Sequence, residues 1–239
     1  MLGGLAVSDL PWSPCRAISM NVPRAVVFDM DGLMFNTEDV YFQVGTELLA
    51  RRGHEFTWEL NLAVLGRPPQ ACFEEMIRWC SLDESWEELA AESEEICLRL
   101  LGEVLAPMPG LLDLLDALEA AAIPKAICTS STRNVLETVL ARFAMKPRFA
   151  FTLTAQDVSH GKPHPEIYLE AARRFHIDPA EMLVLEDSPI GCRSAAAAGA
   201  FVVAVPGKYS RDDDFSVASR VIDGLDDRRL REILKLDAG

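Results

Sequence analysis

The segment Ala25-Val26-Val27-Phe28-Asp29-Met30-Asp31-Gly32 decides the fold of this 239-residue chain, because an apolar run ends there in two carboxylates and a glycine. A wholly apolar run of this length predicts a strand that is buried on both faces, as in a parallel sheet. Two further apolar runs, 126–128 and 182–185, also end in polar motifs. Ligands of open α/β sheets bind beyond the carboxyl ends of parallel strands, so we expect the three motifs to meet.

The remaining chain supports an α/β fold with an insertion. Short apolar runs alternate with amphipathic helical patterns in its second half, which indicates βαβ units. We therefore predict a doubly wound, mostly parallel sheet formed by residues 23–37 and 106–239, with an inserted all-helical cap at 38–105. Residues 1–22 show little periodicity and are interpreted as a loose tail, or as lying upstream of a true start at Met20.

The composition limits the classes of partner. The net charge of −14 argues against surfaces for nucleic acid or anionic membranes, because both need basic patches. No apolar run approaches membrane-spanning length. The six cysteines include no Cys-x-x-Cys pair, which is typical of buried thiols in a reducing cytoplasm. We expect a cytoplasmic protein with no nucleic-acid or membrane partner; the sequence defines no oligomeric state, and a monomer is compatible with it.

Asp29 and Asp31 are the candidate reacting groups. They flank one residue at a strand end, where both carboxylates can face one cavity, one as nucleophile and the other as proton shuttle. Taken alone, Asp-x-Asp-Gly is also compatible with an ordinary acidic turn. A calcium-binding EF-hand loop is excluded, because its glycine belongs at position six and Gly32 comes at position four.

Two further motifs are candidates for phosphate binding, and each has an ordinary alternative. Thr129, Ser130 and Ser131 precede a helix, where hydroxyl and backbone N–H groups either bind phosphate oxygens or cap the helix. Lys162 lies on a turn between glycine and proline, and it offers a point charge for a phosphate unless it is a solvated surface lysine.

Glu186 and Asp187 are adjacent acids at the end of a wholly apolar strand. They would repel each other unless a cation or hydrogen-bond donors satisfied them. The alternative is that Asp187 or Ser188 caps the helix that begins at Pro189. Four carboxylates, one lysine and a hydroxyl-rich loop suit a magnesium ion and a phosphoryl group.

The order and spacing of these motifs resemble the haloacid dehalogenase superfamily of phosphohydrolases, in the subgroup with a helical cap after the first strand. The segments that carry the resemblance are Asp29-Met30-Asp31-Gly32, Thr129-Ser130-Ser131, Gly161-Lys162-Pro163-His164-Pro165, Glu186-Asp187-Ser188-Pro189-Ile190-Gly191 and Ala195-Ala196-Ala197-Ala198-Gly199.

The resemblance implies a magnesium-dependent phosphatase acting on a small phosphorylated metabolite. It implies that Asp29 attacks phosphorus to form an aspartyl phosphate, while Asp31 protonates the leaving alcohol and then takes a proton from water. The implied phosphate ligands are Thr129, Ser130 and Lys162. The implied magnesium ligands are Asp29, Asp31 through its backbone, Glu186 and Asp187.

Two rival functions remain. A phosphoglucomutase-like enzyme would form the same aspartyl phosphate, but such mutases usually carry a histidine near the cap entrance, where this chain has Tyr41. A non-catalytic phosphate-binding module is disfavoured because no essential residue is missing. Asn36 replaces the aspartate that the family often has at the hinge of the cap. Surface or packing roles are expected for all four histidines, which are His54, His160, His164 and His176.

Overall fold

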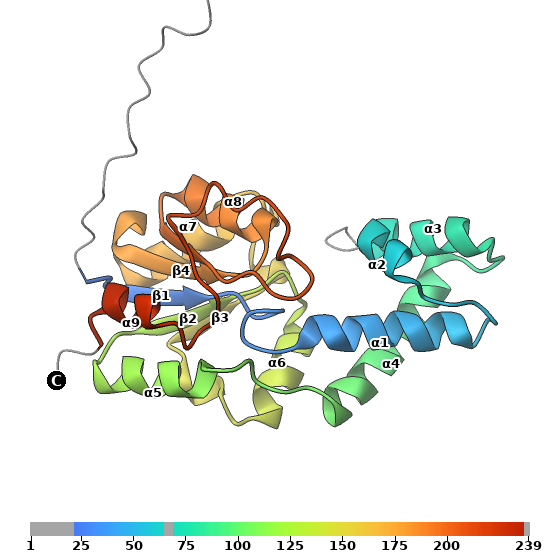
Figure 1. Ribbon diagram of the computed structural model, residues 1–239, viewed down its shortest axis with the longest axis horizontal. Helices are drawn as coiled ribbons and strands as arrows, with labels where there is room; N and C mark the ends of the chain where they lie inside the picture. The colour runs from blue at the N-terminus through green and yellow to red at the C-terminus, as the bar shows by residue number, and fades with distance from the viewer. Residues whose placement is uncertain (1–21, 65–68, 237–239) are drawn as a thin grey trace, which may run out of the picture.

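The computed structural model describes residues 22–64 and 69–236, and a six-stranded sheet lies at its centre (Figure 1). The strands are β1 (Ala25–Phe28), β2 (Lys125–Cys128), β3 (Phe151–Leu153), β4 (Met182–Glu186), β5 (Phe201–Ala204) and β6 (Arg220–Val221). Their spatial order is β3-β2-β1-β4-β5-β6, and every neighbouring pair is parallel. The chain moves outward from β1 to β3 and then crosses to the other side at β4, so the strand order reverses between β1 and β4.

The core lies on both faces of this sheet, as expected for strands that are apolar at every position. Val26 and Phe28 face one apolar cluster, whereas Val27 faces a second. Figure 1 shows α7 (Glu166–Phe175) and α8 (Pro189–Ala198) on one face, and α5 (Leu111–Ala120) and α6 (Arg133–Arg142) on the other. The predicted doubly wound α/β architecture is therefore confirmed.

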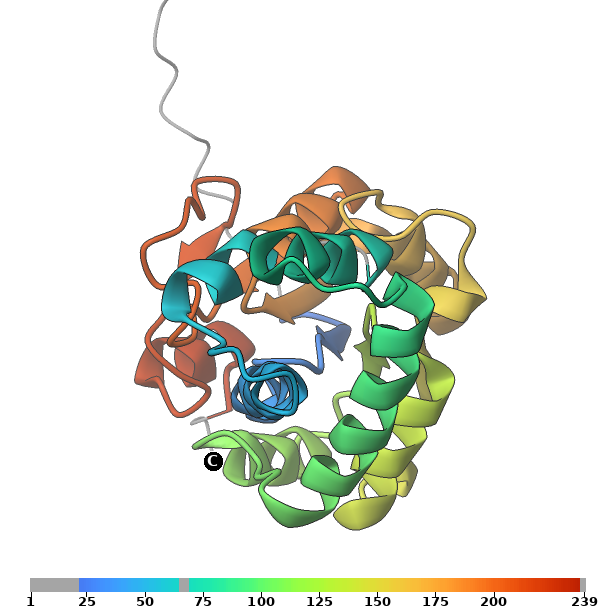
Figure 2. The ribbon, with the colours of Figure 1, turned by 90° about the vertical axis from the view of Figure 1, so that its right-hand side faces the viewer.

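Four helices follow the first strand: α1 (Thr37–Ala50), α2 (Trp58–Val64), α3 (Pro69–Cys80) and α4 (Trp86–Glu103). Among the described residues from 37 to 103 there is no strand. Ser85 and Glu88 form a capping box at the start of α4, as their spacing predicts. Figure 2 shows these helices in front of the end of the sheet. The boundaries 38–105 for a separate cap stay a prediction.

Asn36 joins the two connections between these helices and the sheet. Its side-chain Oδ1 accepts from the backbone N–H of Ala106 at 2.7 Å, and its backbone N–H donates to the Ala106 carbonyl at 3.1 Å. Thr37 does not cap α1; its hydroxyl instead accepts the N–H of Gly32 at 3.0 Å. The same N–H also donates to the Phe35 carbonyl at 3.0 Å, so the threonine adds a second acceptor that stabilises the turn after Asp31.

The remaining elements are short. They are the 3-10 helices η2 (Lys146–Arg148), η3 (Ala155–Asp157) and η4 (Pro179–Glu181), and the last helix α9 (Arg228–Leu234). The predicted tail at 1–22 lies outside the described residues except for its last position. In the part of the chain that is described, none of the helices combines the length and apolarity needed to cross a lipid bilayer.

Candidate active site

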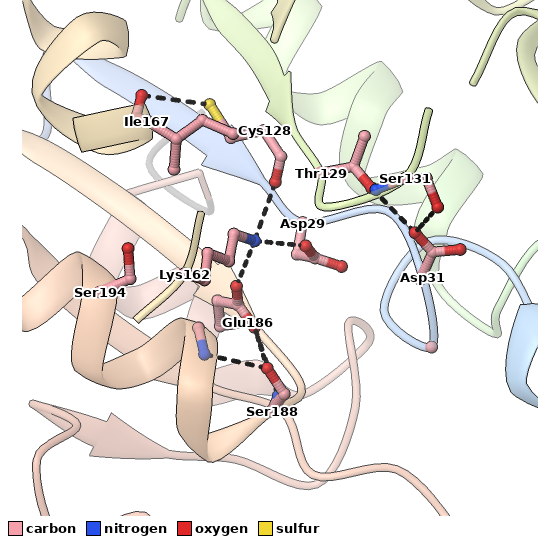
Figure 3. Close-up of polar contacts among 12 residues, drawn as sticks. Asp29, Asp31, Cys128, Thr129, Ser131, Lys162, Ile167, Glu186, Ser188 and Ser194 are labelled. Carbon is pink, nitrogen blue, oxygen red and sulfur yellow. Dashed lines mark hydrogen bonds and ion pairs between the residues drawn. The ribbon is translucent and has the colours of Figure 1, made fainter. Parts of the chain in front are cut away.

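Asp29 follows directly after β1, at the carboxyl edge where the strand order reverses. Its backbone N–H continues the sheet by donating to the Leu185 carbonyl at 3.0 Å. This bond holds the residue in line with the strand, so its carboxylate projects beyond the sheet end. The residue is only 6% exposed, and its Oδ1 lies 2.5 Å from Nζ of Lys162 (Figure 3).

Lys162 is a buried lysine with all three ammonium donors in use. Nζ lies 2.5 Å from Oδ1 of Asp29, 2.6 Å from Oε1 of Glu186 and 3.0 Å from the Cys128 carbonyl oxygen. Burial alone would lower the pKa of Lys162, but the two carboxylates raise it well above its ordinary value. The solvated-lysine alternative is therefore wrong, and Lys162 joins the ends of β1, β2 and β4 as a permanent cation.

Glu186 is fully buried, and its carboxylate is held from both sides. Oε1 accepts from Lys162 and from the Tyr168 hydroxyl at 2.7 Å, while Oε2 accepts from the Ser188 hydroxyl at 3.0 Å. Gly191 allows this position, because a Cβ there would lie 1.8 Å from Oε1 of Glu186. Ser188 also caps α8 by accepting the Gly191 N–H, so the capping alternative holds for Ser188 and leaves Asp187 free for another role.

Asp187 is the third buried carboxylate. One oxygen from each of Asp29, Glu186 and Asp187 can be chosen so that all three lie within 4.8 Å of one another. We call these three residues the carboxylate cluster. Gly32, at φ +73°, allows the close approach, since a Cβ there would lie 2.2 Å from Oδ2 of Asp187. Among the described residues, no hydrogen-bond donor or ion-pair partner reaches the Asp187 carboxylate.

The charges of the carboxylate cluster do not balance. Burial raises the pKa of Asp29 to about 8; Lys162 opposes this rise, and Glu186 and Asp31 add to it. Burial and the carboxylates of Asp29 and Glu186 also raise the pKa of Asp187 well above its ordinary value. One lysine thus faces three acids, and the cluster needs further positive charge to be ionised at neutral pH. A cation with hard oxygen ligands, such as magnesium, fits this donor set.

Asp31 lies apart from that cluster and points towards the end of β2 (Figure 3). Its Oδ2 accepts from the Thr129 and Ser131 hydroxyls, each at 2.8 Å, and the Tyr41 hydroxyl of α1 lies 3.4 Å from Oδ1. We call Asp31, Thr129, Ser131 and Tyr41 the Asp31 cluster. Asp31 is only partly buried, so it keeps access to solvent and to a bound ligand.

The hydroxyl-rich loop divides its functions among successive residues. Thr132 caps α6 by accepting the Val135 N–H at 3.4 Å, so the capping alternative applies to Thr132. Thr129 is buried; its hydroxyl accepts the Ser131 N–H at 2.9 Å and donates to Asp31. Ser130 is exposed, and its role in phosphate binding stays a prediction.

The structure brings most of the predicted site residues to one edge, but in two groups. Asp29, Lys162, Glu186 and Asp187 lie together, and Asp31 lies with Thr129. Sequence reasoning missed Tyr168, because a tyrosine on an amphipathic helix reads as core. Ser131 lies in the predicted phosphate-binding motif but was not named as a phosphate ligand, and its hydroxyl donates to Asp31.

The loop after β5 connects this site to the helical insertion. The Ser210 hydroxyl donates to the Asp187 carbonyl at 2.7 Å, and the Tyr209 hydroxyl donates to Oδ1 of Asp39 in α1 at 2.6 Å. The Tyr209 ring also stacks on Trp58 of α2, with ring centroids 5.5 Å apart. Helices α1 and α2 are therefore held against the side of the sheet end that carries Asp187.

Comparisons with known proteins agree with this geometry. A Drosophila melanogaster protein named "Probable pseudouridine-5′-phosphatase" is 33% identical over 84% of this chain and 89% of its own length. A haloacid dehalogenase family hydrolase from Deinococcus radiodurans, solved with phosphate and sodium, is 26% identical, with a TM-score of 0.76 over 90% of this chain and 98% of its own.

Another solved structure shares the fold alone. The β-phosphoglucomutase of Clostridium difficile is 23% identical, with a TM-score of 0.71 over 90% of this chain and 96% of its own.

The sequence profile of haloacid dehalogenase-like hydrolases matches residues 26–205, which include the whole carboxylate cluster, Lys162 and the Asp31 cluster. The chain therefore belongs to the haloacid dehalogenase-like hydrolase family.

Proposed function

We propose that this protein is a magnesium-dependent phosphatase that hydrolyses a small phosphomonoester through an aspartyl phosphate on Asp29. The observation that carries the proposal is the Asp29 carboxylate, buried at the switch point of the sheet and held 2.5 Å from Lys162. Ligands of this fold bind at that point. The D. melanogaster relative, named for phosphatase activity, and the D. radiodurans structure with bound phosphate support the same chemistry.

In the proposed reaction, Oδ2 of Asp29 attacks phosphorus while Oδ1 stays on Lys162, and the ester P–O bond breaks. Asp31 gives its proton to the departing alcohol oxygen. In the second step Asp31 takes a proton from water as that water attacks phosphorus, and the bond between phosphorus and Oδ2 of Asp29 breaks. This step restores both aspartates and releases inorganic phosphate. Thr129, Ser130 and Lys162 are the proposed phosphoryl ligands, and Lys162 also keeps Asp29 in place.

Magnesium is the proposed cofactor because the carboxylate cluster has an excess of acids over cations. Asp29, Glu186 and Asp187 would hold the ion, directly or through water, and the backbone of Asp31 would complete the set. When bound, the ion supplies charge neutralisation for the nucleophile and for the phosphoryl oxygens. Glu186 already accepts from Lys162, Tyr168 and Ser188. We therefore infer that Asp29 and Asp187 are its main protein ligands.

Residues 38–105 are the proposed lid of the site. Tyr41 of α1 reaches Asp31, and Tyr209 joins α1 and α2 to the loop beside Asp187. A lid of this kind excludes water and limits the substrate to a small molecule. Phosphoproteins and polynucleotides should accordingly be poor substrates.

The mutase alternative would use the same Asp29. Tyr41 argues against it, because this residue stands where mutases of the subgroup usually keep a histidine, and its hydroxyl lies 3.4 Å from Asp31. A non-catalytic binding module would not need a second, separately hydrogen-bonded aspartate beside the first.

The test incubates the purified protein with a panel of sugar phosphates and nucleoside monophosphates in magnesium, and follows inorganic phosphate and positional isomers together. We expect phosphate release from at least one small ester, loss of activity in excess chelator and poor recovery with calcium, which tolerates looser coordination. Isomers forming faster than phosphate would favour the mutase. Absence of both products across the panel would favour the binding module.

A further inference from the structure

The turn that carries Lys162 presents a second group of metal-ligand side chains on its outer side. His160, His164 and Glu166 each offer a ligand atom, and these atoms lie within 4.8 Å of one another. The two imidazole rings have centroids 4.6 Å apart. Oε2 of Glu166 lies 2.8 Å from Nδ1 of His160 and 3.7 Å from Nδ1 of His164.

The backbone fixes the positions of these side chains. The Glu166 carboxylate accepts the N–H groups of Ser159 and His160 at 2.7 and 3.0 Å, so it closes the turn from the far end. The His164 N–H donates to the Gly161 carbonyl at 3.0 Å, and the buried Ser194 hydroxyl donates to the His164 carbonyl at 2.7 Å. Both histidines therefore project from an ordered turn, although nothing in the proposed reaction requires a histidine there.

Lys162 and the histidines point to opposite sides of this turn. The Lys162 side chain is 5% exposed and reaches inward to Asp29, whereas the His160 and His164 side chains are 66% and 50% exposed. Neither histidine is a member of the carboxylate cluster. The chemistry of the two groups also differs, since imidazole nitrogens suit zinc, nickel and copper, while carboxylates alone suit magnesium.

We propose that His160, His164 and Glu166 form a surface site for a divalent transition-metal ion, separate from the magnesium site. Two imidazoles and a carboxylate are a familiar set of three protein ligands, with water completing the coordination. A bound ion would tie the two ends of the turn together across Lys162. Transition metals would then stabilise the protein through a site that magnesium does not occupy.

The test is calorimetric titration of tag-free, chelator-treated protein with nickel ions in saturating magnesium, so that the carboxylate cluster is already filled. We expect one nickel ion per chain. Both His160→Gln and His164→Gln should weaken binding by at least about tenfold, the scale on which even outer-shell changes act at metal sites. His54→Gln is the matched control on another exposed histidine, and it should bind nickel as the wild type does.

Two further measurements separate this site from the active site. Asp187→Asn should leave nickel affinity unchanged, because Asp187 belongs to the carboxylate cluster. Nickel should raise the melting temperature of the wild type and of His54→Gln, but not of His160→Gln, since a ligand stabilises only the state that binds it. Equal affinity in all variants, a loss confined to Asp187→Asn, or no binding at all would overturn the proposal.

Discussion

The carboxylate cluster with Lys162 and the Asp31 cluster lie side by side, yet they differ in burial and in the groups that hold their carboxylates. Asp29, Glu186 and Asp187 are at most 6% exposed, and burial together with the neighbouring carboxylates raises the pKa values of Asp29 and Asp187. Asp31 is partly exposed and is held by neutral hydroxyls instead. The difference teaches that two aspartates separated by one residue can have very different surroundings, which fits the proposed roles: a nucleophile held beside a fixed cation and a proton shuttle with access to solvent.

The largest effect should come from Asp29, the proposed nucleophile. Asp29→Asn keeps the shape of the side chain but removes the attacking charge, so turnover should fall by on the order of 10⁴-fold or more, the scale of lost catalytic nucleophiles. Phosphate release by purified protein with a native circular dichroism spectrum measures it. Asp113→Asn, an exposed change in α5, is the control and should retain activity. Substantial turnover by Asp29→Asn would refute the assignment.

Asp31→Asn should have a smaller effect that depends on the substrate. Loss of general acid–base catalysis typically costs about 10²–10⁴-fold. A nitrophenyl phosphate has a leaving group that needs little protonation, so its cleavage should suffer less than that of an alkyl phosphate. Comparing kcat for the two esters checks this role, and an equal loss for both would argue that Asp31 serves structure alone.

The charge imbalance of the carboxylate cluster should appear as a pH dependence of stability in excess chelator. The pKa of Asp29 is raised to about 8 in the folded protein, and that of Asp187 is also raised. The native state therefore binds more protons than the unfolded chain from about pH 4 upward, and for Asp29 this window extends to about pH 8. Their contribution to stability is present at low pH and is lost as the pH rises through this window. The cation-free protein should lose at least about 1 kcal/mol, or about 2–4 °C of Tm, across it.

Thermal scans at several pH values measure this effect, and two controls isolate it. Asp187→Asn removes one ionisable acid, so its Tm should fall less with rising pH than that of the wild type. Magnesium should remove most of the fall in the wild type, because it binds the ionised carboxylates. A fall that is identical in the variant would place its origin outside the cluster.

The smallest effects should come from two tyrosine hydroxyls, one that contacts the carboxylate cluster and one in the Asp31 cluster. Tyr168→Phe removes a buried donor to Glu186 at 2.7 Å, so kcat/KM should fall by roughly tenfold, equivalent to about 1–2 kcal/mol. Tyr41→Phe removes an exposed contact at 3.4 Å and should lower kcat/KM less than about threefold. The pair is matched in chemistry. A larger loss for Tyr41→Phe would show that the Asp31 cluster is as tightly constrained as the carboxylate cluster.

Several elements could be read from the sequence because their signals are local. The apolar strands β1, β2 and β4, the Ser85–Glu88 capping box and the helical run after α1 all follow from short-range patterns. The strand β6, the helix α9 and the three 3-10 helices were not predicted. β6 has two exposed residues and no pattern to detect, whereas α9 did carry a signal, with Asp227 as its cap and Leu230 and Leu234 buried one turn apart.

The sequence by itself determined which residues stand at the ends of strands, and therefore which edge of the sheet carries the chemistry. It also determined that acids outnumber bases there, which is the reason for expecting a cation. Only the tertiary structure decided how these residues are grouped. It brought Tyr168 to Glu186 and turned Asp31 towards Ser131. It also placed His160 beside His164. The first two contacts join segments 18 and 100 residues apart, which no local pattern records, and the third depends on the geometry of the turn around Lys162.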